Sequence, residues 1–208
     1  MVAIAYKPQL VTVKFLGYAG LMSRPTYHHG DLRAVILTEA ARLVAERGAD
    51  GVSLRELARE AGVSHAAPAH HFTDRRGLFT ALAAQGFELL AAVLAEARPS
   101  FLAAALAYVR FAIEHPGHYR VMFDKSLLDP SNPELVTAEA AAADELSRGV
   151  ASLSDRHAQV DPRGAQLAAW SLVHGFSMLW LNDAVNPGLK ATDPMATVER
   201  IAMMLFEE

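Results

Sequence analysis

The sequence predicts an all-α protein with about nine helices, divided into an N-terminal three-helix domain and a larger helical C-terminal domain. Apolar residues recur at helical spacing through most of the 208-residue chain. Alanine-rich runs such as residues 138–143 strongly favour helix. The turn-rich alternating runs that are typical of β-sheet are missing. We therefore expect helices from about residue 31 to residue 206.

Composition narrows the class of protein. The chain is 52% hydrophobic and 20% charged, which is enough apolar material for a buried core. It contains no cysteine, so disulfides and thiolate zinc sites are excluded and a cytoplasmic location is expected. Residues 22–80 hold eight basic and seven acidic residues, whereas residues 81–208 hold nine and sixteen. Only the N-terminal part is therefore suited to a polyanionic partner.

Residues 1–26 are interpreted as an N-terminal extension. They contain Lys7 and Lys14 among scattered apolar residues and glycines, without a helical period. Lys14 interrupts the apolar stretch, so a secretory signal is not expected, and no run reaches the ~18 apolar residues of a membrane span. Met22 begins the segment that follows. We expect residues 1–21 to be a misread start or a disordered arm.

Two helices are predicted in the next segment. The first should be capped by Asp31 and closed by Gly48. The second begins with Ser53-Leu54-Arg55-Glu56, which has the pattern of a capping box. In a capping box the Ser53 hydroxyl accepts from the Glu56 N–H, and the Glu56 side chain reaches back to the Ser53 N–H.

A tight turn at Ala61-Gly62-Val63 follows the second helix. Gly62 supplies the flexible position, and Val63 is expected to plug the turn into the core. A short third helix is predicted from Ser64 to about His71, with Phe72 as its apolar anchor. Two helices joined by such a turn, here over residues 53–72, can read DNA because the second fits the major groove. Many helical proteins contain this corner without binding DNA, so the turn alone leaves both interpretations open.

Helices are also expected throughout the C-terminal part. Asp74 should cap a helix that ends near Pro99. Asp161-Pro162 and Asp193-Pro194 each place a capping residue directly before a proline, a combination that starts helices. The helices beyond residue 99 are expected over about residues 100–114, 116–123, 133–153, 162–183 and 194–206.

One helical face carries an apolar stripe formed by Leu167, Trp170, His174, Met178 and Leu181. Such stripes are more often core than ligand site, so burial is the favoured interpretation. A glycine, Gly175, lies in the middle of the same helix, where it costs about 1 kcal/mol relative to alanine. Close approach of another helix is the expected compensation.

The motifs of residues 27–89 resemble the N-terminal domain of the TetR family of regulators. They are, in order, Tyr27-His28-His29-Gly30-Asp31-Leu32-Arg33, Ser53-Leu54-Arg55-Glu56-Leu57-Ala58, Ala61-Gly62-Val63-Ser64 and His71-Phe72. The resemblance implies a helix-turn-helix DNA-binding domain over residues 29–89, with residues 64–71 as recognition helix. It also implies a homodimer on a palindromic, double-stranded operator.

The resemblance and the residue chemistry together give a set of expected DNA contacts. Ser53 and the segment around Arg75 are expected at phosphates, and Ala66 and Ala67 are small enough to touch thymine methyl groups. The family usually has a tyrosine where this chain has Ala69, so one phosphate contact is expected to be lost. The full set is Ser53, Arg55, Ser64, His65, Ala66, Ala67, Ala69, His70, His71 and Arg75.

Residues 100–206 resemble the C-terminal domain of the family branch named after a Trp-His-Gly signature, so an effector-binding and dimerisation domain is expected over residues 90–208. Here the signature is Trp170-Ser171-Leu172-Val173-His174-Gly175. The resemblance implies that residues 162–183 and 194–206 pair with their copies in the dimer. The candidates for the effector pocket are Tyr108, Phe111, Met122, Phe123, Trp170 and His174. They are mostly apolar, which suits a small, largely hydrophobic effector and offers no strong partner for a charged one.

These features predict a cytoplasmic repressor that a small apolar effector releases from DNA, with no cofactor and no metal site. Adjacent histidine pairs point in different directions, and no carboxylate follows at metal-ligand spacing. An enzyme is the main alternative, although no phosphate loop or nucleophile elbow is present and His115 with His118 is the best catalytic candidate. A helical ligand-binding or interaction protein with weakened DNA binding is the second alternative. It stays open because Ala69 stands where the family usually has a tyrosine.

Overall fold

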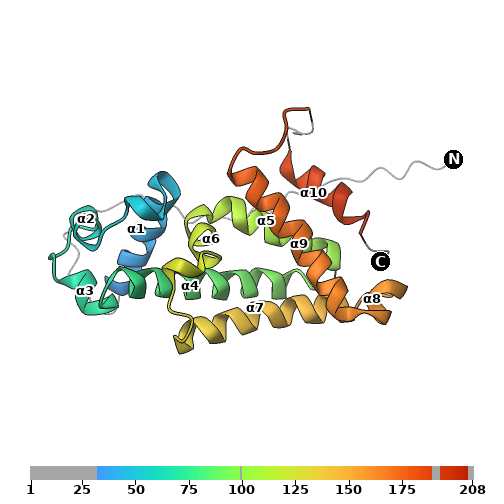
Figure 1. Ribbon diagram of the computed structural model, residues 1–208, viewed down its shortest axis with the longest axis horizontal. Helices are drawn as coiled ribbons and strands as arrows, with labels where there is room; N and C mark the ends of the chain where they lie inside the picture. Colours follow the sequence, from blue (N-terminus) through green and yellow to red (C-terminus); the bar gives the residue numbers. More distant parts are fainter. Residues whose placement is uncertain (1–31, 99, 189–192, 206–208) are drawn as a thin grey trace, which may run out of the picture.

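The computed structural model describes residues 32–98, 100–188 and 193–205, and all the regular secondary structure in these ranges is helical (Figure 1). The all-α prediction is confirmed, with one short helix, α8, that the sequence did not predict. The expected cap at Asp31, the motif at residues 27–31 and the N-terminal extension lie outside the described residues. The α-helices are α1 Leu32–Arg47, α2 Leu54–Glu60, α3 Ala67–Phe72, α4 Arg75–Glu96, α5 Phe101–Glu114, α6 Pro116–Met122, α7 Pro133–Ala151, α8 Arg156–Val160, α9 Pro162–Leu181 and α10 Pro194–Ala202.

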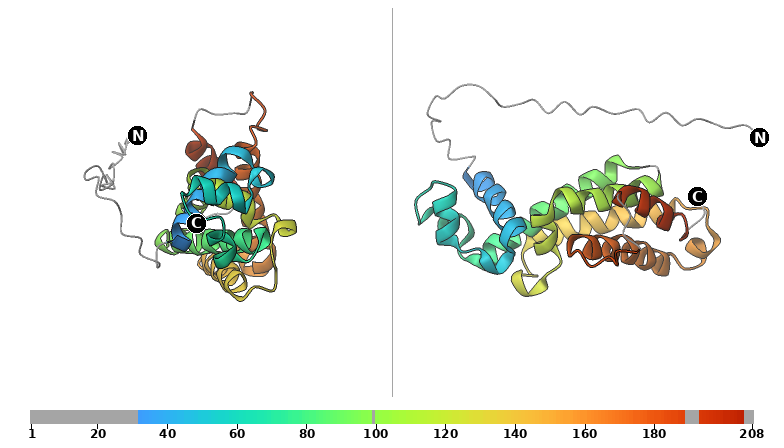
Figure 2. Two further views of the ribbon diagram at one scale, coloured as in Figure 1. Left: turned by 90° about the vertical axis from the view of Figure 1, so that its left-hand side faces the viewer. Right: turned by 90° about the horizontal axis from the view of Figure 1, so that it is seen from above.

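The described chain is elongated, with α2 and α3 at one end and α8 at the other (Figures 1 and 2). The central helix α4 runs along the molecule and packs against α7 over much of its length. By length and composition alone α4 could cross a membrane, but half of its apolar stretch is buried inside this fold, as in the core helix of a globular protein. Helices α9 and α10 pack on α5.

Polar residues start most of these helices, as the sequence predicts. The Asp74 carboxylate accepts a hydrogen bond from the Gly77 N–H at 2.7 Å, which begins α4. The Asp161 carboxylate accepts from the Gly164 N–H at 2.9 Å, and Pro162 takes the first position of α9. Equivalent caps are made by Ser53, Ser100, Asn132, Asp155 and Asp193.

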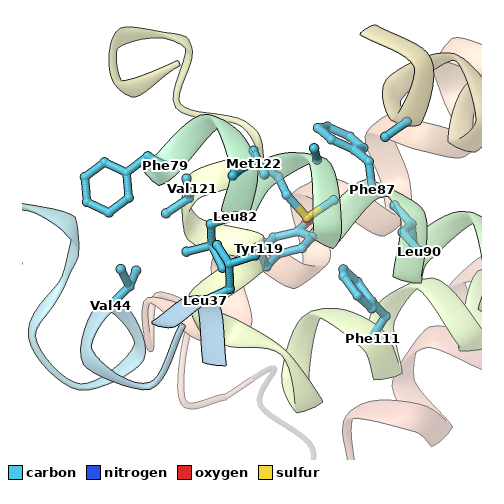
Figure 3. Packing of buried hydrophobic residues seen from close by; sticks show 14 of the residues in the cluster. Leu37, Val44, Phe79, Leu82, Phe87, Leu90, Phe111, Tyr119, Val121 and Met122 are labelled. Carbon is cyan, nitrogen blue, oxygen red and sulfur yellow. The ribbon is translucent and has the colours of Figure 1, made fainter. Parts of the chain in front are cut away.

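One continuous core extends from α1, α2 and α3 to α9 and α10, and Figure 3 shows part of it. A second, smaller cluster lies where α8 packs on α7 and α9. Leu37 of α1, Leu82 of α4 and Tyr119 of α6 are almost fully buried within the continuous core. The division expected between residues 89 and 90 falls inside α4, which contributes to this core on both sides of that point. A rearrangement around α6 therefore affects packing on α1 as well.

Helix α6 packs unusually close to α1. At Gly117 a β-carbon would lie only 1.9 Å from the backbone oxygen of Ala41, so only glycine fits. Arg120 of α6 donates to the Ala45 carbonyl at 2.9 Å and thereby binds the exposed carbonyl groups at the end of α1. Both contacts hold α6 directly on α1.

The apolar stripe of α9 lies largely on the surface, so the interpretation of the stripe as core is wrong. Leu167 is 60% exposed, and Trp170 and Met178 are each 40% exposed. The residues that α9 buries against the rest of the chain are on another face, and the largest of them is Phe176. The alanines Ala165 and Ala169 let that face pack closely, which turns the stripe outward.

Candidate nucleic-acid interface and effector cavity

The second helix of the expected DNA-reading motif is capped by Ser53, whose hydroxyl accepts from the Glu56 N–H at 3.2 Å. This confirms the first half of the predicted capping box. The second half is wrong, because the Glu56 carboxylate pairs with Arg47 of α1 rather than with the Ser53 N–H. That ion pair fixes the N-terminal end of α2 against α1.

The turn after α2 depends on Gly62, whose φ of 66° lies in the left-handed region that favours glycine. Val63 was expected as the buried plug but is partly exposed, and Pro68 is buried in its place. Helix α3 begins at Ala67, three residues later than predicted. The reason is Pro68, which has no N–H to donate to the Ser64 carbonyl and is tolerated only in the first turn.

The residues expected to contact DNA lie on α2, α3, the turn between them, the N-cap of α2 and the first residue of α4, at one end of the molecule (Figure 1). Ala67, His71 and Arg75 are half-buried, which leaves the remaining members of the set as the solvent-facing ones. The exposed members are Ser53, Arg55, Ser64, His65, Ala66, Ala69 and His70. Their contacts with DNA remain a prediction.

The arginines near α2 differ in whether they already form ion pairs within the protein. Arg47 pairs with Glu56, and Arg59 lies 3.1 Å from the Glu60 carboxylate. Arg55 is exposed and forms no ion pair with any residue in the described ranges. It is therefore the α2 arginine best placed for a phosphate group.

Arg75 has a structural role that the sequence did not indicate. Its guanidinium donates to the carbonyl of Ala49 at 2.7 Å and to that of Val52 at 3.0 Å. It also lies over the Phe79 ring, 4.7 Å from the centroid. These contacts join the turn before α2 to the start of α4, so Arg75 positions the helix-turn-helix as well as being a candidate phosphate contact.

An apolar cavity of about 270 Å³ lies in the C-terminal part, between α4, α5, α7, α9 and α10. Of the six candidates for an effector pocket, Tyr108, Phe123 and Trp170 line this cavity, whereas His174 is not among its lining residues. Phe111 and Met122 do not line it, because both are buried in the central core (Figure 3). The other lining side chains are mostly aliphatic, with Phe87, Leu90, Leu94, Phe101, Leu146 and Val173 among the largest.

A neutral hydrogen-bonded cluster adjoins this cavity. The imidazole Nδ1 of His174 lies 2.9 Å from the Tyr119 hydroxyl and 3.1 Å from the Tyr108 hydroxyl. The His174 ring also packs against Phe123 and Trp170, with centroids 4.5 Å and 5.4 Å away. Burial lowers the pKa of His174 and raises the pKa of both tyrosines, so all three groups are neutral near pH 7.

The sequence analysis missed the wall that α7 contributes. Glu139, Ala142, Ala143, Leu146 and Gly149 line the cavity. Their spacing places them on one helical face, which was the available signal. Glu145 lines the cavity as well, and its side chain is only 8% exposed. The expectation that no lining residue is a strong partner for a charged ligand is therefore wrong.

The histidine cluster named as a catalytic candidate has a packing role. The rings of His115 and His118 are 5.8 Å apart, and His118 Nε2 lies 3.0 Å from the Gln85 side-chain oxygen. Burial, together with His115, lowers the pKa of His118 to about 4. The cluster thus joins α6 to α4. Among the described residues, no group of three or more potential ligands is arranged to hold a metal ion.

Two family models match the chain. Residues 36–82 match the bacterial regulatory proteins of the tetR family, and residues 101–205 match the tetracyclin repressor-like C-terminal domain. The chain belongs to the TetR family. This family consists of transcriptional regulators with a helix-turn-helix and is not an enzyme family. The C-terminal match does not specify the Trp-His-Gly branch, which remains a prediction.

The chain is also similar to a named transcriptional repressor and to a solved structure. The HTH-type transcriptional repressor AcnR of Corynebacterium diphtheriae is 42% identical over 64 residues, which cover 31% of this chain and 34% of that repressor. This chain thus matches only about a third of the length of AcnR. A structure of a protein of unknown function from Rhodococcus sp. RHA1 is 35% identical, with a TM-score of 0.68, and the match covers 86% of this chain and 95% of that one.

AibR, solved in complex with isovaleryl coenzyme A and operator DNA, is a more distant structural neighbour of this TetR-family chain. It is 19% identical, with a TM-score of 0.64, and the match covers 84% of this chain and 98% of AibR. At this identity the likeness shows a shared fold.

Proposed function

We propose that this TetR-family protein is a dimeric repressor that binds a palindromic operator through α2 and α3 and is released by a small, largely apolar effector. The observation that carries the proposal is the continuous core between the exposed helix-turn-helix and the apolar cavity. Within this proposal, residues 29–89 form the DNA-binding part, residues 90–208 form the effector and dimer part, and the protein acts in the cytoplasm.

The exposed face of α9 supports the dimer. Leu167, Trp170 and Met178 follow one another at helical spacing and are all at least 40% exposed. A β-carbon built on Gly175 would meet no atom within 4 Å, so the close helix contact expected there is not made within the protomer. An apolar stripe with a glycine at its centre suits close packing against the α9 of a second copy. Helix α10, which packs beside α9, would complete a four-helix interface.

Helix α6 supports the coupling between effector and DNA. Tyr119 of α6 contacts His174 beside the cavity, and Gly117 of the same short helix packs on α1. An effector that favours a different position of α6 would raise the population of one form of the dimer. In that form the distance between the two recognition helices would not match successive major grooves. AibR, with its bound acyl coenzyme A and operator, supports the idea that one fold can hold both ligands.

A gel-shift titration with the DNA that flanks the gene, repeated at several salt concentrations, tests the proposal. We expect a specific complex whose affinity falls steeply with salt, because basic side chains displace counterions from phosphates. Arg55→Gln should weaken binding to all DNA and lower the salt slope by about one. A protein that shifts no DNA at low salt, or shifts flanking and scrambled DNA equally, would contradict the proposal and favour an interaction module.

A further inference from the structure

Trp170 lies on α9 between the face that the protomer buries and the apolar stripe that it leaves exposed. Ala169 and Val173, on one side of Trp170, are buried. Leu167 and Met178, on the other side, are 60% and 40% exposed, and Trp170 itself is 40% exposed. Residues three apart on a helix are neighbours, so Trp170 adjoins both faces. Its position allows one side chain to contact the interior of its own protomer and a second copy.

The Trp170 indole also forms part of the apolar cavity. Trp170 and Phe123 both line the cavity, and their ring centroids are 6.3 Å apart. Phe123 is the residue at which α6 ends. The His174 ring, one turn further along α9, packs on both, with centroids 5.4 Å from Trp170 and 4.5 Å from Phe123. A molecule in the cavity would therefore contact an aromatic group that reaches from α9 to α6.

The cavity borders on the two helices that the proposed dimer interface uses. The lining residues from α9, from α10 and from the turn after α10 are Ala169, Trp170, Leu172, Val173, Ala202 and Leu205. Trp170 is the one that also belongs to the exposed stripe formed by Leu167, Trp170 and Met178. The cavity and the proposed interface thus meet at this side chain.

Fixing the indole of Trp170 in one position has an entropic cost that two contacts would share. A partly exposed side chain loses conformational freedom when an interface or a ligand orders it. The α9 of a second copy would order the indole from the stripe side, and a ligand would order it from the cavity side. Whichever contact forms first lowers the cost of the second, so the two events favour each other. Because linkage is reciprocal, each strengthens the other by the same factor.

We propose that Trp170 is shared between the apolar cavity and the dimer interface, so that an apolar molecule in the cavity strengthens the dimer. This inference rests on the proposed function, in which the cavity is the effector site and α9 pairs with its copy. It adds how the two sites regulate each other. The effector releases the operator from a dimer that it holds together more firmly, rather than by separating the two protomers.

Subunit exchange in the full-length protein tests the inference, with butylbenzene as the apolar probe. The chain contains no cysteine, so Ala141→Cys, at an exposed position of α7, provides a single labelling site. Donor-labelled and acceptor-labelled dimers are mixed, and the rise in energy transfer gives the rate at which dimers dissociate. We expect saturating butylbenzene to slow exchange about fivefold or more, a typical size for coupling between two sites. Exchange that is unchanged or faster with the probe bound would overturn the inference.

Three substitutions on α9 locate the coupling. Trp170→Leu should remove most of the slowing by saturating butylbenzene. The matched controls are Leu167→Ala, which changes the stripe outside the cavity, and Leu172→Ala, which changes the cavity wall outside the stripe. In both controls saturating probe should slow exchange by the same factor as in the wild type. If Trp170→Leu does not fold or no longer binds the probe, Trp170→Phe serves, and the factor should be at least halved. An undiminished factor in the Trp170 variant would overturn the inference.

The fluorescence of Trp170 separates failure of this inference from failure of the proposed function. In a Trp180→Phe background Trp170 is the only tryptophan of the chain, so its emission reports whether butylbenzene reaches it. If calorimetry shows binding but the emission and the exchange rate do not change, only the shared role of Trp170 fails. If butylbenzene does not bind, the proposed apolar effector fails as well. If the labelled chains show no energy transfer and sediment as monomers, the proposed dimer fails.

Discussion

The Tyr119 hydroxyl lies 2.9 Å from Nδ1 of His174 and so links α6 to α9. Tyr119 is itself buried between α1, α4 and α5 (Figure 3). Two residues earlier, Gly117 packs on the α1 backbone. A helix of seven residues therefore touches both the N-terminal helices and the cluster beside the cavity.

Removing the Tyr119 hydroxyl should weaken this link without leaving a large cavity. Tyr119→Phe keeps the ring in the core but leaves His174 with Tyr108 as its remaining hydroxyl partner. We expect a loss of about 1 kcal/mol in the free energy of unfolding, the usual value for one buried hydrogen bond. Urea denaturation of both proteins measures the difference. Unchanged stability would show that the contact is not a stabilising hydrogen bond.

Gly117→Ala should be far more damaging than its size suggests. The added methyl group would lie 1.9 Å from the Ala41 oxygen and 2.7 Å from the Ala41 carbonyl carbon, which are backbone atoms that cannot rotate away. We expect a loss of roughly 3 kcal/mol or more in unfolding free energy, at the upper end for overpacking. Operator affinity should fall with it, because α1 supports the helix-turn-helix. A variant as stable as the wild type would contradict the close packing of α6 on α1.

Gly175→Ala is the matched substitution at a glycine with open surroundings. The isolated protomer should gain up to about 1 kcal/mol from helix propensity, because nothing within 4 Å opposes the new methyl group. The dimer should weaken if α9 packs there against its copy. Sedimentation over a dilution series measures the dissociation constant of each protein. An unchanged constant would argue against an interface centred on Gly175.

The sequence predicted most helix boundaries but not the start of α3 or the cavity wall. Caps such as Asp74 and Asp161 are local, since a side chain bonds to a backbone N–H three residues away. Pro68 is local too, because it has no N–H to donate to the Ser64 carbonyl and so moves the start of α3 to Ala67. The aromatic residues Tyr108 and Trp170 stood out by type, whereas the α7 wall was hidden because an alanine-rich helix with regularly spaced carboxylates also suits a solvated surface.

Contacts between distant segments could not be predicted in the same way. The packing of Gly117 on Ala41 depends on the relative placement of two helices that are far apart in the sequence. Arg75 looked like a phosphate contact from its position, but its bonds to Ala49 and Val52 depend on how the turn before α2 folds back. Which face of α9 is buried depends on the helices that pack against it. The sequence does not show these helices, so the apolar stripe was expected in the core although it lies on the surface.

Stability should fall in mild acid because of His118. Its pKa of about 4 in the folded protein, lowered by burial and by His115, is below the ordinary value of 6.5. Between these values the unfolded chain binds more protons, so stability is full above about pH 6.5 and decreases as pH falls towards 4. We expect roughly 1–2 kcal/mol of additional loss between pH 6.5 and 5, compared with His118→Gln. Parallel pH profiles for the two proteins would contradict this origin.

The central claim is that two copies of this chain place α3 in successive major grooves of one operator. Hydroxyl-radical footprinting of the DNA that flanks the gene tests it most directly. We predict two protected patches on one face of the duplex, with centres about one helical turn or a small multiple apart. The protection should be lost with His65→Glu, which puts a negative charge on an exposed turn residue next to α3. A single patch, or a footprint that His65→Glu leaves unchanged, would contradict the account.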